Sequence, residues 1–277
     1  MTQTHILGNQ QRISRIGDSG PARRDYENHL REQAKLKAEQ ERLAREGPQV
    51  QAPPETQEPA QPQEPQAPES PPSNLDGFIY VPSIKLYVAK QRTLHNLDWY
   101  DTHKELHKQG STMPTIPQFI EFLKYLRTDY ENKDEAQQIL DEILTVRSPW
   151  RSEWLDAKFR NQNNQMYVDF NHKPQGADLT PKNSERLTNY LSENKTPGIN
   201  LDDWLSRPTS QGLPPSDCKS GDLYYWNPRD GRVSRFGADS DGIDLYCSWG
   251  PGSSDGALGV RLVRGGDKGD ASAKSAS

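Results

Sequence analysis

Residues 232–264 interleave two kinds of residue, one apolar and regularly spaced and the other small, polar or aromatic. Along 243–248, Ile243, Leu245 and Cys247 alternate with polar or ring-bearing residues, as in a strand with one buried face. We predict that the recurring apolar residues are framework: Val233, Phe236, Ala238, Leu245, Cys247, Leu258, Val260 and Leu262. The other side of this strand, with Asp244, Tyr246 and Ser248, is predicted to be displayed.

The residues between the framework positions are small, polar or aromatic, and we predict that they bind a ligand. Tyr and Trp offer large contact area at low entropic cost, and Ser, Gly and Asp offer hydrogen bonds and backbone freedom. The predicted binding residues are Gly237, Asp239, Ser240, Asp241, Gly242, Asp244, Tyr246, Ser248, Trp249, Gly250, Ser253, Ser254, Asp255 and Gly256. The same composition is also typical of an ordinary surface loop.

The frame Val-Ser-Arg-Phe at 233–236, Leu-Tyr-Cys at 245–247 and Ala-Leu-Gly-Val-Arg at 257–261 resembles the variable region of the target proteins of diversity-generating retroelements. In that family an error-prone reverse transcriptase alters adenines, mostly in Asn codons, and the copy replaces part of a receptor gene. Such changes yield Asp, Ser, Gly, Tyr and Ile, the residues that crowd 237–256, where Asn is absent. Trp249 would need another template codon. The resemblance implies a variable region at about 232–258.

Upstream of this region the pattern is of mixed class. Apolar runs at 78–81 and 84–88, divided by Pro82-Ser83, predict an opening hairpin. Residues 97–109 predict a short helix, and 134–146 predict another. In the first helix Trp99, His103 and Leu106 are expected to lie on one side. In the second helix the expected apolar side is Ile139, Leu140, Ile143 and Leu144.

A capping signal near residue 115 predicts a third helix. Thr115 and Gln118 have capping-box spacing, and Pro117 lies in the first turn. Its predicted buried face is Phe119, Phe122, Leu123 and Leu126. Strands followed by a Pro-Thr-x-x-Gln-Phe helix are similar to the C-type-lectin-like fold that formylglycine-generating enzymes share with retroelement-diversified receptors, which usually have Glu where Gln118 stands. The resemblance implies the α+β class and a C-type-lectin-like, ligand-binding domain at 76–264.

Three aromatic-rich segments, 147–155, 202–205 and 221–226, are predicted to be packed framework rather than ligand contacts. Trp and Tyr bury large areas, and their polar tips find hydrogen-bond partners inside a domain. These segments therefore extend the predicted core well beyond the two strands and three helices named above.

The segments on either side of the predicted domain, 1–75 and 265–277, differ from it in composition. Residues 1–23 are predicted to be disordered, and 24–46 to form a charged helix that Gly47 and Pro48 end. Because its apolar residues do not hold a heptad, a single solvated helix is favoured over an oligomerising coiled coil. Residues 47–75 form a Pro/Gln/Glu-rich linker, and 265–277 a disordered polar tail.

Charge and hydropathy narrow the function classes. The net charge of -5 disfavours nucleic acid as a partner, because such binding relies on a clustered basic surface. No apolar run approaches the roughly 18 residues of a membrane span, so no membrane insertion is expected. Residues 1–20 lack the apolar core of a signal peptide. The cytoplasm is the default expectation, and the location is otherwise open.

The search for catalytic and metal-binding residues leads to a negative prediction. His103 and His107 are spaced i, i+4 but lack a convincing third ligand, so they are predicted to lie on an exposed polar face. The aspartates at 239, 241 and 244 lack the later ligands of a calcium loop. Cys218 and Cys247 are expected to be buried free thiols. No metal, cofactor or catalytic residue is predicted.

The sequence therefore predicts a ligand-binding, receptor-like protein and not an enzyme, with an unknown protein or surface ligand as its partner. Replacing Tyr246 and Trp249 by Ser is expected to change stability by less than about 1 kcal/mol, whereas Leu245→Ala or Leu258→Ala is expected to cost about 2–5 kcal/mol. Two alternatives stay open. One is an enzyme of the formylglycine-generating (sulfatase-modifying) type, and the other is an assembly protein that oligomerises through 24–46.

Overall fold

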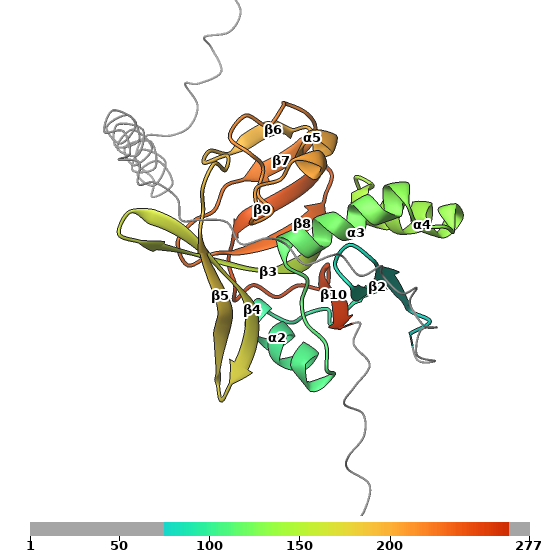
Figure 1. Cartoon of the computed structure of the whole chain (residues 1–277), viewed down its shortest axis with the longest axis horizontal. Helices are drawn as coiled ribbons and strands as arrows, with labels where there is room; N and C mark the ends of the chain where they lie inside the picture. The colour runs from blue at the N-terminus through green and yellow to red at the C-terminus, as the bar shows by residue number, and fades with distance from the viewer. Residues whose placement is uncertain (1–74, 266–277) are drawn as a thin grey trace, which may run out of the picture. The chain divides into compact units, whose positions relative to one another are not determined.

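The computed structural model describes residues 75–265, and Figure 1 shows their arrangement. The segments predicted at 1–23 and 24–46 lie outside the described residues, as do the linker up to residue 74 and the tail from residue 266. The described chain combines helices and strands, so the mixed class predicted from the sequence is confirmed. None of the helices within 75–265 is both long enough and apolar enough to cross a membrane.

The strands of residues 75–265 join into one ten-stranded sheet in the order β1-β2-β10-β3-β8-β9-β7-β6, and the second half of β3 also pairs with β4, which pairs with β5. The pairs β10–β3 and β7–β9 are parallel, and the others are antiparallel. The strands are β1 (Phe78–Val81), β2 (Leu86–Thr93), β3 (Arg151–Gln162), β4 (Gln165–Gln175), β5 (Asp178–Arg186), β6 (Lys195–Ile199), β7 (Leu223–Trp226), β8 (Val233–Ala238), β9 (Ile243–Trp249) and β10 (Leu258–Gly265). The helices are α2 (Trp99–Lys108), α3 (Ile116–Thr128), α4 (Lys133–Leu144) and α5 (Leu201–Ser206).

The opening hairpin and the three predicted helices are confirmed, as β1–β2 and as α2, α3 and α4. The β4–β5 hairpin, which extends away from the rest of the sheet in Figure 1, was not predicted. Strand β5 reads Asp-Leu-Thr-Pro-Lys-Asn-Ser-Glu-Arg and is largely exposed, so it has no apolar alternation to reveal it. Its position comes from backbone pairing with β4.

Helix α3 begins with the predicted capping box. The Thr115 hydroxyl accepts a hydrogen bond from the Gln118 backbone N–H at 3.4 Å, and the Gln118 side chain accepts one from the Thr115 N–H at 2.9 Å. These contacts satisfy two of the N–H groups that a helix start leaves open. The predicted buried face of α3 is confirmed at Phe119, Phe122, Leu123 and Leu126.

Strand β3 carries a buried charge network in the middle of the sheet. The carboxylate of Glu153, which is fully buried, accepts hydrogen bonds from Arg151 at 2.8 Å and from Arg261 at 3.0 Å. Burial favours a higher pKa, but the two guanidinium groups outweigh it and lower the pKa of Glu153 to about 2. Glu142 of α4 lies 3.0 Å from both arginines. The network therefore ties β3, β10 and α4 together.

The framework residues predicted in 232–264 are all buried: Val233, Phe236, Ala238, Leu245, Cys247, Leu258, Val260 and Leu262. Half of the aromatic residues predicted as framework are buried too, namely Trp154, Trp204 and Tyr225, whereas Tyr224 is partly buried. Trp150 and Trp226 are only partly buried. Both of them contact the predicted binding surface.

Candidate ligand-binding face

Three adjacent strands place Trp226, Tyr246 and Arg235 side by side. Trp226 of β7 is paired with Tyr246 of β9, and Tyr246 is paired with Arg235 of β8. Directly paired residues share one face of a sheet, so the three side chains form a row. The rings of Trp226 and Tyr246 stack with their centres 5.0 Å apart, and Arg235 Cζ lies 4.9 Å from the centre of the Tyr246 ring.

Two further tryptophans surround the same guanidinium group. Arg235 Cζ lies 4.2 Å from the ring centre of Trp249 and 5.4 Å from that of Trp150. The Tyr246 and Trp249 rings meet edge to face at 5.1 Å. A cation held near ring faces at these distances is attracted by the ring quadrupoles. We call Trp150, Trp226, Arg235, Tyr246 and Trp249 the aromatic cluster.

Asp244 lies beneath this cluster and is not displayed, contrary to the prediction. It is 5% exposed, and its Oδ1 lies 3.1 Å from Arg235 Nη1, as an ion pair rather than a well-directed hydrogen bond. Arg235 Nη1 also donates to the Ser152 hydroxyl at 2.8 Å. Burial raises the pKa of Asp244 to about 6, against the opposing charge of Arg235. Alternation along β9 placed Asp244 on the correct face, but that face is covered here.

Gly237 was also predicted to be displayed, and this prediction is wrong. Strand β8 lies between β3 and β9, and all of its residues are buried. A Cβ atom on Gly237 would lie 2.4 Å from Arg235 Nη1 and 2.7 Å from the Ser152 hydroxyl oxygen. The absence of a side chain at 237 therefore makes room for the guanidinium group of Arg235. Gly242 is buried as well, at the start of β9.

The other predicted binding residues are at least partly accessible. They occupy β9 and the loops at its two ends, 239–242 and 250–257. Those classed as exposed are Ser240, Asp241, Ser254, Asp255 and Gly256, and those partly buried are Asp239, Tyr246, Ser248, Trp249, Gly250 and Ser253. Their role in binding stays a prediction.

Two of the aspartates in these loops hold their own turns. Asp239 Oδ1 accepts hydrogen bonds from the N–H groups of Asp241 at 2.8 Å and Gly242 at 3.2 Å, and Asp255 Oδ1 accepts one from Ala257 at 2.7 Å. Such turns are a common use of Asp side chains. The acidic character expected of this surface is therefore partly committed to loop structure.

A hollow of about 480 Å³ adjoins the aromatic cluster at Trp150, which lines it. Backbone hydrogen bonds join the two loops to this part of the chain. Arg147, between α4 and β3, donates its N–H to Asp239 O at 2.9 Å, and Ser152, near the start of β3, donates its N–H to Ala257 O at 3.0 Å. The hollow is lined by Arg92, Thr145, Arg147, Ser148, Pro149, Trp150, Arg151 and Ala257. Sequence reasoning assigned this segment to the core and so missed it as part of a binding face.

The cluster retains unused hydrogen-bond donors. Within residues 75–265, Arg235 Nε and Trp249 Nε1 are buried and have no hydrogen-bond partner. Buried polar groups in native proteins are nearly always paired with protein or water. The two donors are therefore available to a bound water or ligand. Arg235 itself was missed as a site residue, although it stands between the framework residues Val233 and Phe236.

The cysteines give no support to a thiol-based active site. Both are free; Cys247 is buried as predicted, but Cys218 is partly exposed. Burial raises the pKa of both thiols to about 12, and Asp203 adds to the rise at Cys218. Reactive cysteines instead have lowered pKa values. Neither thiol therefore has the lowered pKa of a reactive cysteine.

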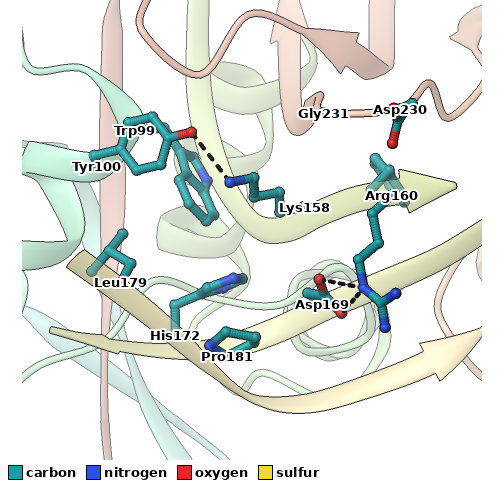
Figure 2. Close-up of a pocket in the computed structure, with 11 residues that line it drawn as sticks. Trp99, Tyr100, Lys158, Arg160, Asp169, His172, Leu179, Pro181, Asp230 and Gly231 are labelled. Atoms are coloured by element: carbon teal, nitrogen blue, oxygen red, sulfur yellow. Dashed lines mark hydrogen bonds and ion pairs between the residues drawn. The ribbon is translucent and has the colours of Figure 1, made fainter. Parts of the chain in front are cut away.

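The two histidines of α2 have different surroundings. His107 is exposed as predicted, but His103 is 3% exposed, so the prediction of a polar surface is wrong for His103. It faces Asp156 of β3 and His172 of β4. A cavity of about 240 Å³ lies beside this group, and Figure 2 shows its lining residues. Sequence spacing could not reveal the group, because its members come from three separate elements.

Comparisons with protein-family models, with curated proteins and with solved structures found no match for this chain. The function is therefore argued from the geometry of the chain itself, together with the resemblance noted in its sequence.

Proposed function

We propose that this chain is a ligand-binding protein of the retroelement-diversified type, with a C-type-lectin-like domain that presents a variable surface. The observation that carries the proposal is the aromatic cluster, in which Arg235 lies among three rings between two accessible loops. Trp, Tyr and Arg are the residue types that dominate binding energy at protein interfaces.

A rigid support beneath the cluster favours this role. Strand β8 is buried along its whole length, and Arg235 is held from below by Asp244 and Ser152. Binding residues that are already ordered lose little conformational entropy when a ligand arrives. The two loops carry Ser, Gly and Asp, which adapt their hydrogen bonds to different partners.

The separation of framework from surface is what a diversified receptor needs. Framework residues such as Leu245 and Leu258 are buried, whereas Ser240, Asp241 and Ser254 are exposed and can change with little effect on packing. Gly237, Gly242 and Asp244 are buried, so we remove them from the proposed binding set. The proposed partner is a protein or another surface ligand that offers groups to the aromatic rings and the unpaired donors.

The nucleotide sequence around the gene tests the diversification directly. We expect a near-copy of the region that encodes 232–264, close to a reverse transcriptase gene. It should differ almost only where the copy has adenine, at codons such as those of Ser240 and Tyr246, and keep the codons of Phe236 and Leu245. If no such copy exists, the diversification proposal fails, and an ordinary domain with a fixed surface remains.

A pair of matched libraries tests the binding face. One library randomises the displayed positions Ser240, Asp241, Tyr246, Trp249 and Ser254, and is selected against lysozyme as a model protein. The control library randomises the buried positions Phe236, Leu245, Cys247, Leu258 and Val260. We expect the first library to retain folded members and to yield binders, and the control library to lose folding. Equal loss of folding in both libraries would contradict the proposed face.

A further inference from the structure

A second feature of the structure lies outside the aromatic cluster and joins three elements. His103 of α2, Asp156 of β3 and His172 of β4 each direct one potential ligand atom toward the others, and these atoms all lie within 4.8 Å of one another. Asp156 Oδ1 is 3.5 Å from His103 Nε2 and 2.5 Å from His172 Nδ1. All three residues are buried.

The hydrogen bonds around the group leave one atom without a partner. Asp156 Oδ2 accepts the backbone N–H of His172 at 3.0 Å, while Oδ1 faces both imidazole rings. Within residues 75–265, His103 Nε2 is buried and has no hydrogen-bond partner. An unprotonated imidazole nitrogen in this position has a lone pair that it can offer to a metal ion. An ordinary Asp–His pair would not account for this unpaired nitrogen.

Neighbouring residues fix the orientation of both rings. The Trp99 ring packs edge to face against the two imidazole rings, with its centre 4.3 Å from that of His103 and 4.9 Å from that of His172. The Trp99 indole N–H is itself fixed by the Leu155 carbonyl at 3.1 Å. Asn171 has a left-handed φ of 56° immediately before His172, an unusual conformation within a strand. An apolar wall and constrained rings are typical of the surroundings of metal ligands.

We infer that His103 Nε2, Asp156 Oδ1 and His172 Nδ1 bind a divalent transition-metal ion, with Zn²⁺ as the best match. Two imidazole nitrogens and one carboxylate oxygen suit Zn²⁺, whereas Mg²⁺ and Ca²⁺ favour oxygen ligands. Ligand atoms about 2.0–2.1 Å from a tetrahedral Zn²⁺ lie about 3.3 Å apart. The distance of 3.5 Å between His103 Nε2 and Asp156 Oδ1 already fits this value. The distance of 2.5 Å between His172 Nδ1 and Asp156 Oδ1 would widen by about 1 Å on metal binding.

Three protein ligands leave a fourth coordination position for water or a ligand group, as in sites that are not purely structural. The cavity of about 240 Å³ is lined by His172 and Trp99, so one side of the group borders open space. Figure 2 shows His172 among the residues that line this cavity. Lys158 lines it too, and its ammonium group donates a hydrogen bond to the Tyr100 hydroxyl at 3.3 Å. Of the three proposed ligands, His172 is the one that lines this cavity.

The test uses the full chain, freed of metal with a chelator and titrated with Zn²⁺ and with Co²⁺. Calorimetry and elemental analysis should give one Zn²⁺ per chain, and bound Co²⁺ should show the visible absorption of a tetrahedral site. His103→Gln and His172→Gln should each weaken Zn²⁺ binding at least about 10-fold, since even outer-sphere changes typically cost that much. His107→Gln, on the exposed side of the same helix, is the matched control and should bind like the wild type.

A measurement on the wild-type chain alone covers the case in which a variant does not fold. In ¹⁵N spectra of the imidazole rings, Zn²⁺ should shift the nitrogens of His103 and His172 and leave those of His95 and His107 unchanged. The inference is overturned if the wild type binds no stoichiometric Zn²⁺, if His103→Gln binds it as tightly, or if the shifts occur at other histidines only.

Discussion

Arg235 of the aromatic cluster forms an ion pair with Asp244, with 3.1 Å between Nη1 and Oδ1. Each residue is 5% exposed. The same guanidinium group therefore contacts a buried carboxylate on one side and three aromatic rings on the other. This pair connects the proposed binding face to the core of the sheet, so substitutions in the pair should change the stability of the protein.

Replacement of Arg235 by Leu should lower the free energy of unfolding by about 3–5 kcal/mol, because it leaves the buried carboxylate of Asp244 without its partner. Urea denaturation followed by circular dichroism measures the loss. Adding Asp244→Asn to Arg235→Leu should restore more than about 1 kcal/mol, since the uncompensated charge is then gone. A double variant no more stable than Arg235→Leu would show that the ion pair is not the cause.

Gly237→Ala should destabilise the protein by about 1–3 kcal/mol, because the added Cβ lies 2.4 Å from Arg235 Nη1 and the core must shift to admit it. Gly252→Ala is the matched control, since a Cβ there meets nothing within 4 Å. Its effect should stay within about 0.5 kcal/mol. Thermal unfolding of the two variants side by side decides the matter, and equal transition temperatures would contradict the packing argument.

Tyr246→Ser and Trp249→Ser should each cost about 1–2 kcal/mol, somewhat more than the sequence suggested, because each ring contacts the Arg235 guanidinium. The cost should remain below the about 2–5 kcal/mol expected for the buried Leu245→Ala. Chemical denaturation of the three variants gives the ranking. If either ring substitution costs as much as Leu245→Ala, that ring belongs to the core and not to the displayed face.

Asp244 should contribute less to the stability of the protein as the pH rises from about 4 to about 6. Burial raises its folded pKa to about 6 from 3.8, so the folded state holds a proton that the unfolded state has lost. The stabilisation is complete below the unfolded pKa and disappears as the pH passes the folded one. The change amounts to about 2–3 kcal/mol at about 1.4 kcal/mol per pKa unit.

Comparison with Asp244→Asn isolates this effect from other titrating groups. The difference in unfolding free energy between wild type and variant should shift against the wild type across that pH window. Arg235, Asp239 and Arg151 are the charges that act on Asp244, and they are the same in both proteins. A difference that is independent of pH would mean that Asp244 does not titrate there.

Much of the local structure could be predicted from the sequence, because it depends on residues that lie close together in the chain. The capping box of Thr115 and Gln118 depends on residues three apart, and the buried face of α3 follows from helical spacing. The hydrophobic alternation around Leu245 and Cys247 likewise identified a strand and its inward side. Strand β5 escaped detection because it is polar and is held by pairing rather than by burial of its own side chains.

The candidate sites could be predicted from the sequence only in part. The displayed loops were found because their residue types differ from those of the framework, but Arg235 and Trp150 reach the same face from strands and segments far apart in sequence. The group of His103, Asp156 and His172 was invisible for the same reason. No spacing rule connects a helix, a central strand and the strand that follows it.

The framework residues of 232–264 could be identified from the amino-acid pattern alone, because burial of apolar side chains follows a periodicity that is visible in neighbouring positions. Which polar residues are accessible depends instead on how distant parts of the chain pack. Asp244 and Gly237 follow the same local pattern as their exposed neighbours, yet both are covered, because strand β8 lies inside the sheet and Arg235 fills the space between them. Exposure of a polar side chain depends on what other parts of the chain place against it.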